Sequence, residues 1–181
     1  MTNRWAVQLD KLTQTYQREF GGLSASQLNW KPNGKTWSIA QNLDHVIKVN
    51  ETYFPVLDAL RREQYRTPLL GRIGLAVRFF GKMVLQAVEP TRRKRMKTMR
   101  LWEPAASDLP ADIVNRFGAH QQALLAQIAD SQDLVRKGAI IASPASNAIV
   151  YKLDTAFDII VSHEERHLAQ AREVLALLPV A

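Results

Sequence analysis

The chain has 181 residues, 46% of them hydrophobic and 23% charged, and it contains no cysteine. This length and composition predict one globular domain over residues 1–181, and the lack of cysteine excludes disulfides, thiolate metal ligands and a cysteine nucleophile. The net charge of +7 is unevenly distributed: residues 61–100 hold twelve Lys and Arg residues and two acids, and the rest of the chain carries −3. This distribution excludes a uniformly basic nucleic-acid binder.

The first two predicted helices lie in the N-terminal third of the chain. Helical spacing over residues 5–20 places five apolar side chains on one stripe: Trp5, Leu9, Leu12, Tyr16 and Phe20. Two glycines end this helix, and a polar connection with turn-forming residues follows. The second helix is predicted over residues 38–64, capped by Ser38 or Thr36 and kinked at Pro55, because proline cannot donate a hydrogen bond to the preceding turn.

Residues 65–107 are predicted to form a basic insert between the second and third main helices. Within this insert, residues 72–87 favour an extra helix between Pro68 and Pro90. A basic run follows at residues 92–100, and its charged members are Arg92, Arg93, Lys94, Arg95, Lys97 and Arg100.

Two further helices complete the predicted fold. The third main helix covers residues 111–131, and a loop containing Ser, Ala and Pro leads to the last helix at residues 152–178. No segment alternates between polar and apolar residues for more than a few positions, so no strand is predicted. The sequence therefore predicts an all-α fold, a four-helix bundle with an extra helical basic insert.

No segment of the sequence is typical of a secreted or membrane-spanning protein. The first ten residues lack the apolar core of a secretion signal. The most apolar later stretch, residues 73–88, is shorter than the roughly 20 residues that a membrane-spanning helix needs. Together with the lack of cysteine, these features predict a cytoplasmic protein without a transmembrane segment.

The four histidines provide the main functional signal. His163 and His167 lie one helical turn apart, on the face of the last predicted helix that also carries its apolar residues. Two imidazoles on a buried face need polar partners, and a shared metal ion would provide one. His45 lies at the edge of the apolar arc of the second helix, from which it could reach the same point. Three imidazoles would leave a coordination position open, as in a catalytic metal site.

Other interpretations of these residues stay open at this stage. A buried histidine can instead be satisfied by a carbonyl or a carboxylate, which would make each ring a structural residue. His120 falls on the apolar face of the third helix, where it could be a fourth ligand, a proton shuttle or a core histidine. Glu164 is predicted on the buried face of the last helix. It could act there as a general base, accept a hydrogen bond from an imidazole N–H, or form a salt bridge as a core residue.

Residues 163–167 also match the H-E-x-x-H pattern of zinc proteases. Those enzymes need a third ligand, commonly well downstream. The chain has no histidine after His167, and Glu173 is predicted to face solvent. The pattern alone therefore does not indicate a protease.

Several motifs together resemble those of the DinB/YfiT-like superfamily. They are Leu-Ser-Ala-Ser-Gln-Leu-Asn-Trp at residues 23–30, Pro32, Trp-Ser-Ile-Ala-Gln-Asn-Leu-Asp-His at residues 37–45, and His163-x-x-x-His167-x-x-Gln170. The resemblance covers roughly residues 5–60 and 150–178. It implies a four-helix bundle with a site for nickel, zinc or a similar ion at His45, His163 and His167. Relatives in that superfamily include thiol-dependent S-transferases, a mycothiol-dependent isomerase and proteins described as metal-dependent hydrolases.

The leading functional hypothesis is a metal-dependent enzyme that acts on a small-molecule substrate, of the thiol-dependent S-transferase or hydrolase type. Glu164 or His120 would move protons, and a low-molecular-weight thiol would serve as a second cofactor in the transferase version. The metal site could also be vestigial. The outer faces of the helices and residues 73–88 favour a homodimer.

The alternative is a non-catalytic binding module whose basic insert contacts nucleic acid or an anionic surface. The basic run of residues 92–100 is interleaved with Met96 and Met99, and Trp102 lies just beyond it. A solvated loop or a dimer-contact helix is the structural alternative for the same residues. Of the two possible partners of the basic insert, nucleic acid is less favoured than an anionic surface.

Overall fold

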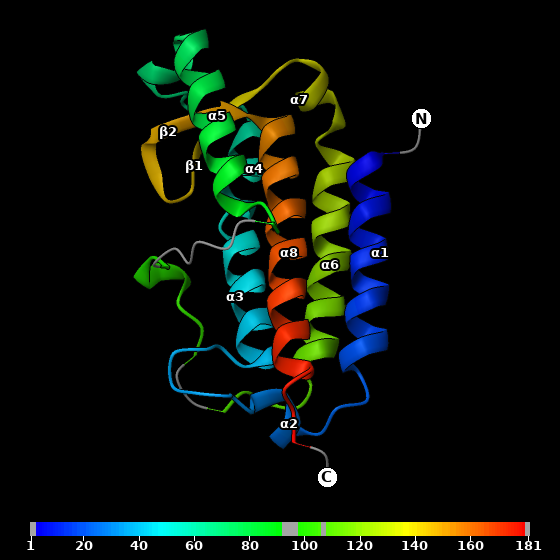
Figure 1. Cartoon of the computed structure of the whole chain (residues 1–181). Helices are drawn as coiled ribbons and strands as arrows, with labels where there is room; N and C mark the ends of the chain where they lie inside the picture. The colour runs from blue at the N-terminus through cyan, green and yellow to red at the C-terminus, as the bar shows by residue number, and fades with distance from the viewer. Residues whose placement is uncertain (1–2, 92–97, 106–107, 180–181) are drawn as a thin grey trace.

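The computed structural model describes residues 3–91, 98–105 and 108–179 of the chain. Four of its helices lie side by side in Figure 1: α1 (Arg4–Phe20), α3 (Ile39–Glu51), α6 (Ile113–Asp130) and α8 (Leu153–Leu175). Helix α1 contacts α6 and α8, and α3 contacts the same two helices on the other side. The core lies between these four helices, where Tyr16, Leu43, Phe117 and Phe157 are almost fully buried.

Helix α3 begins at a capping box. Ser38 accepts a hydrogen bond from the Gln41 backbone, and the Gln41 side chain accepts one from the Ser38 backbone. Ser38, rather than Thr36, is therefore the N-cap. The helix ends at Glu51, and α4 (Phe54–Arg61) continues with Pro55 in its first turn, where a missing backbone N–H costs no helical hydrogen bond. The single kinked helix predicted over residues 38–64 is therefore two helices, and the break falls at Thr52 and Tyr53, just before Pro55.

A short helix, α2 (Ala25–Asn29), lies in the segment predicted as a polar connection. It has the same capping box as α3, formed by Ser24 and Gln27. The S-x-x-Q signal was present in the sequence, but one and a half turns contain too few apolar positions to show a helical period.

The segment between α4 and α6 contains η1 (Leu69–Arg72), α5 (Gly74–Val88) and η2 (Arg100–Trp102). The extra helix predicted over residues 72–87 corresponds to α5, which contacts β2 and α8. Gly81 allows this close approach, because a Cβ there would lie 3.3 Å from the Tyr151 Cβ and 3.2 Å from Thr155 Cγ2. Residues 92–97, the larger part of the predicted basic run, lie outside the described residues.

The prediction that the fold is entirely helical is wrong in one place. After α7 (Gln132–Arg136), strands β1 (Ile140–Ser143) and β2 (Ser146–Lys152) form an antiparallel hairpin that pairs Ile141 with Tyr151. The strands are four and seven residues long, and the apolar residues of each are consecutive, so they lack the alternation that identifies a strand in a sequence. β-branched and aromatic residues do favour strands, and Ile141, Val150 and Tyr151 are fully buried here.

No helix in the described parts of the chain combines the length and the apolar character that crossing a bilayer requires.

Candidate metal centre

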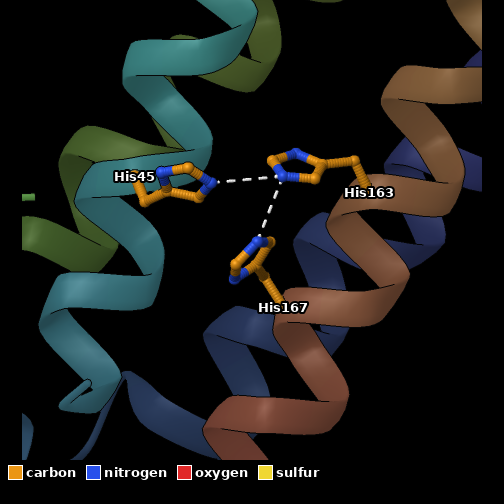
Figure 2. A group of neighbouring side chains, drawn as sticks. All are labelled: His45, His163 and His167. Carbon is orange, nitrogen blue, oxygen red and sulfur yellow. Dashed lines mark hydrogen bonds between the residues drawn. The ribbon is translucent and has the colours of Figure 1, made fainter. Parts of the chain in front are cut away.

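Three histidines from two helices meet at one point (Figure 2). His45 comes from α3, and His163 and His167 come from successive turns of α8. The Nε2 atom of His163 lies 3.2 Å from Nε2 of His45 and 3.1 Å from Nε2 of His167. Within the described residues, these three form the one group that could hold a metal ion, with ligand atoms all within 4.8 Å of one another.

The outer nitrogens of two rings are held by hydrogen bonds. His45 Nδ1 lies 2.6 Å from the carbonyl oxygen of Trp102, and His167 Nδ1 lies 2.8 Å from Oδ1 of Asn42. The amide nitrogen of Asn42 donates to the Ser38 carbonyl, which fixes the orientation of the amide. Because both partners of the rings are acceptors, each Nδ1 carries the proton, and in the neutral rings each Nε2 presents a lone pair.

Two lone pairs therefore face the Nε2 atom of His163. If this atom carries a proton, it can donate to one of the two rings but not to both, so one pair of nitrogens meets without a proton between them. Protonation of the rings is disfavoured. Burial, and secondly the charge of His45, lowers the pKa of His163 to about 3, and burial holds the pKa of His167 well below the ordinary histidine value.

The spacing of the three nitrogens fits a divalent metal ion. Zinc binds imidazole nitrogen at about 2.0–2.1 Å in tetrahedral geometry, which places the ligand nitrogens about 3.3 Å apart. The separations of His163 Nε2 from the other two Nε2 atoms, 3.2 and 3.1 Å, are close to that value. A cation between the rings would accept all three lone pairs at once, so the residues present fit such an ion.

Trp37 forms one wall of the site. Its ring lies 4.8 Å from the ring of His45 and stacks on His167 at 5.9 Å, with an angle of 18° between the planes. Trp37 directly precedes Ser38, so the cap that starts α3 also places this side chain. In the sequence it was visible only as part of a family motif, because a single indole carries no spacing signal.

Residues 102–105 are fastened to α3 beside His45. The backbone N–H of Ala105 donates to Asp44, and the Gln41 side chain donates to the Ala105 carbonyl, both within 2.9 Å. Lys48 donates to the Glu103 carbonyl at 3.1 Å. These contacts hold the Trp102 carbonyl against His45. Sequence reasoning missed this partner, because a backbone carbonyl has no side-chain signature.

Glu164 is buried, as predicted, but its carboxylate is bound by amides. Its Oε1 accepts from Asn50 Nδ2 at 2.8 Å, and its Oε2 accepts from Gln121 Nε2 at 2.5 Å. Burial raises the pKa of Glu164 to about 8, although both hydrogen bonds oppose this shift. Among the described residues, no hydrogen bond joins this carboxylate to an imidazole N–H.

His120 lies in α6, outside the three-histidine group. Its ring stacks on Phe54 at 5.6 Å, and its Nε2 atom is buried without a hydrogen-bond partner in the described part of the chain. Burial lowers the pKa of His120 to about 4. The neutral ring therefore occupies an apolar position at neutral pH. Glu173 is exposed, as predicted.

The sequence model of the DinB superfamily matches residues 8–171 of the chain. This range contains both helices that carry the histidines, and it extends across the segment where the motifs alone gave no resemblance. No curated protein and no solved structure matches the chain.

The pH dependence of stability tests the buried neutral state of His120. An unfolded histidine takes up a proton near pH 6.5, whereas His120 in the folded chain does so only near pH 4. The unfolded state therefore binds more protons between these values, and the folded state loses stability as the pH falls. In the presence of a chelator, the variant His120→Phe should gain about 2 kcal/mol relative to wild type between pH 7 and pH 5.

The measurement is urea unfolding of both proteins at several pH values in that range. Comparison with wild type cancels the titration of all other groups, including Glu164, whose raised pKa acts in the opposite direction. A difference in the free energy of unfolding that stays constant between pH 7 and pH 5 would show that the ring is not buried in its neutral form.

Proposed function

The chain belongs to the DinB superfamily, and we propose that it binds one divalent metal ion, nickel or zinc, through His45, His163 and His167. The observation that carries this proposal is the direction of the lone pairs. Hydrogen bonds from Nδ1 to Trp102 and Asn42 leave two Nε2 atoms aimed at a third within 3.2 Å. The architecture we infer around the site is a four-helix bundle with a basic insert at residues 65–107.

The proposed function is a metal-dependent enzyme that acts on a small molecule. Three imidazoles leave at least one coordination position open. When bound, such an ion would lower the pKa of a water or thiol at that position and would polarise an electrophilic substrate. Trp37 provides an aromatic wall beside two of the rings, which suits an organic substrate of modest size.

Two reaction types are compatible with this arrangement. A hydrolase would use water as the nucleophile, and an S-transferase would use a low-molecular-weight thiol as a second cofactor. The residues present favour both equally, because either nucleophile would be made anionic at the same open position.

Glu164 and His120 are the candidates for proton transfer. With a pKa of about 8, Glu164 is mostly a neutral acid at pH 7. The amide oxygens of Asn50 and Gln121 are buried and have no hydrogen-bond partner within the described residues. If either amide flipped, its oxygen would replace its nitrogen beside Glu164 and would accept the carboxyl proton. His120 directly precedes Gln121 in α6, and its neutral ring has a free Nε2 within the described residues. We propose that these groups hold a proton behind the site.

Metal content tests the ligand set. Purified wild-type protein should bind about one nickel or zinc ion per chain, and His163→Ala should lose high-affinity binding because two nitrogens remain. Asn42→Leu removes the acceptor that orients His167, and it should weaken binding about 10–100-fold. Competition with a chromophoric chelator measures these affinities.

The matched control for the metal measurement is His120→Phe, a substitution at a buried histidine outside the three-ring group. Its stoichiometry should equal that of wild type. Loss of metal from this variant, or full affinity in His163→Ala, would contradict the proposed ligands.

Activity is tested on the metal-loaded protein with small electrophiles, in the presence and absence of low-molecular-weight thiols. A reaction that requires thiol identifies a transferase, and one that proceeds in water alone identifies a hydrolase. His163→Ala should lower the rate by about 100-fold or more. The exposed substitution Glu173→Gln, on the same helix, should leave the rate unchanged.

The variant Glu164→Gln separates proton transfer from metal binding. It replaces the carboxyl group with a neutral amide of the same size, so the metal content should stay at the wild-type value while the pH profile of the rate changes. A pH profile identical to that of wild type would show that Glu164 takes no part in proton transfer. If no reaction depends on His163, the enzyme proposal fails, while the proposal that the site binds a metal ion is unaffected.

A further inference from the structure

Exposed apolar side chains gather at one place on the molecule. Within the described residues, nine large hydrophobic side chains are exposed, and seven of them fall between residues 69 and 101. Five of the seven belong to η1, α5 and the residue between them: Leu69, Ile73, Leu75, Phe79 and Met83. We call these five side chains the α5 ridge.

The ridge points away from the body of the protein. Leu75, Phe79 and Met83 recur every four residues, so they lie along one side of α5, and they are 71%, 62% and 39% exposed. The opposite side of the helix is buried, with Val77 and Gly81 packed toward the hairpin and α8. In Figure 1, α5 lies at the outside of the helical body, next to α8 and the hairpin.

The surroundings of the ridge are positively charged. Residues 64–88 contain Arg66, Arg72, Arg78 and Lys82 and no acid. All four cations are exposed, and none of them takes part in an ion pair within the described part of the chain. On α5 itself, Arg78 and Lys82 lie along the flank of the ridge.

A hollow opens on that same flank. It lies between α5 and the start of α8: Val77, Arg78, Gly81 and Lys82 line it from α5, and Lys152, Asp154 and Thr155 line it from the end of β2 and the start of α8. The charged residues of this lining are three cations and a single carboxylate, Asp154. This excess of positive charge suits the phosphate of a lipid headgroup beside the apolar ridge.

We propose that the α5 ridge docks the protein onto an anionic phospholipid bilayer. The apolar side chains would enter the boundary between headgroups and acyl chains, and the flanking Arg and Lys residues would contact lipid phosphates. This surface differs from the three-histidine site in its residues and does not depend on metal.

Two other partners fit the same surface less well. Nucleic acid would satisfy the cations but would leave Leu75 and Phe79 in contact with phosphate and water, without burying them. A second copy of the chain would bury the ridge, but an interface formed by the same surface on both copies would bring two positively charged surfaces together, and residues 64–88 contain no acid to pair with them. A bilayer matches both the apolar and the charged components.

The test is co-sedimentation of the full-length, metal-loaded protein with vesicles of phosphatidylcholine alone or with about 30% phosphatidylglycerol. We expect the protein to bind the anionic vesicles. Binding to the neutral vesicles should be at least fivefold weaker, and adding about 500 mM salt should weaken binding to the anionic vesicles by at least the same factor, because charge contributes to the contact.

Two variants separate the components of the surface. The double substitution Leu75→Ser and Phe79→Ser should reduce binding to anionic vesicles about tenfold, and Arg78→Gln with Lys82→Gln should reduce it by a similar factor. All four side chains are exposed, so unchanged circular dichroism and metal content should confirm that the variants fold.

The matched controls lie elsewhere on the surface. Val7→Ser removes an exposed apolar residue of α1, and Lys11→Gln with Arg116→Gln removes two exposed cations. These proteins should bind vesicles like wild type.

Three results would overturn the proposal. One is equal binding of the ridge variants and the control variants to anionic vesicles. Another is binding to duplex DNA that is unaffected by Leu75→Ser and Phe79→Ser, in a protein that does not bind vesicles. The third is a dimer in sedimentation that these two substitutions dissociate, again without vesicle binding.

Discussion

The arrangement of the site depends on two hydrogen bonds made by the outer nitrogens of its rings. The Trp102 carbonyl binds Nδ1 of His45, and the Asn42 side chain binds Nδ1 of His167. These contacts fix the tautomers, so the inner nitrogens of both rings present lone pairs toward His163. Buried nitrogens that face one another in this way are unfavourable without a shared cation, and burial opposes the protonation that would otherwise supply the charge. The proposed function follows from this electrostatic requirement.

Helix α3 provides most of what orients the site. Its cap, Ser38, sets the first turn and also accepts the hydrogen bond that orients Asn42. Gln41, Asp44 and Lys48 form hydrogen bonds to Glu103 and Ala105, which brings the Trp102 carbonyl to His45. Helix α3 therefore supplies the ligand His45 and the residue that orients His167, Asn42. It also holds the segment whose Trp102 carbonyl orients His45. Helix α8 adds the other two rings through simple one-turn spacing.

Much of the fold and the core of the site could be predicted from the sequence, because both depend on helical period. The stripe from Trp5 to Phe20 and the one-turn spacing of His163 and His167 identify buried faces without reference to any other segment. The hairpin could not be predicted, since the apolar residues of β1 and β2 are consecutive and do not alternate with polar ones. The contact with Trp102 joins positions 57 residues apart through a backbone oxygen, and the amide partners of Glu164 come from two other helices. Such partners are set by tertiary packing alone.

X-ray absorption spectroscopy of protein loaded with one equivalent of zinc or nickel tests the central claim most directly. It reports the number and type of atoms bonded to the ion and their distances. Three imidazole nitrogens at about 2.0–2.1 Å, with the remaining positions filled by exchangeable ligands such as water, would agree with convergence of the three Nε2 atoms on one ion. An ion with fewer than three nitrogen neighbours, or a spectrum unchanged in His45→Ala, would contradict it.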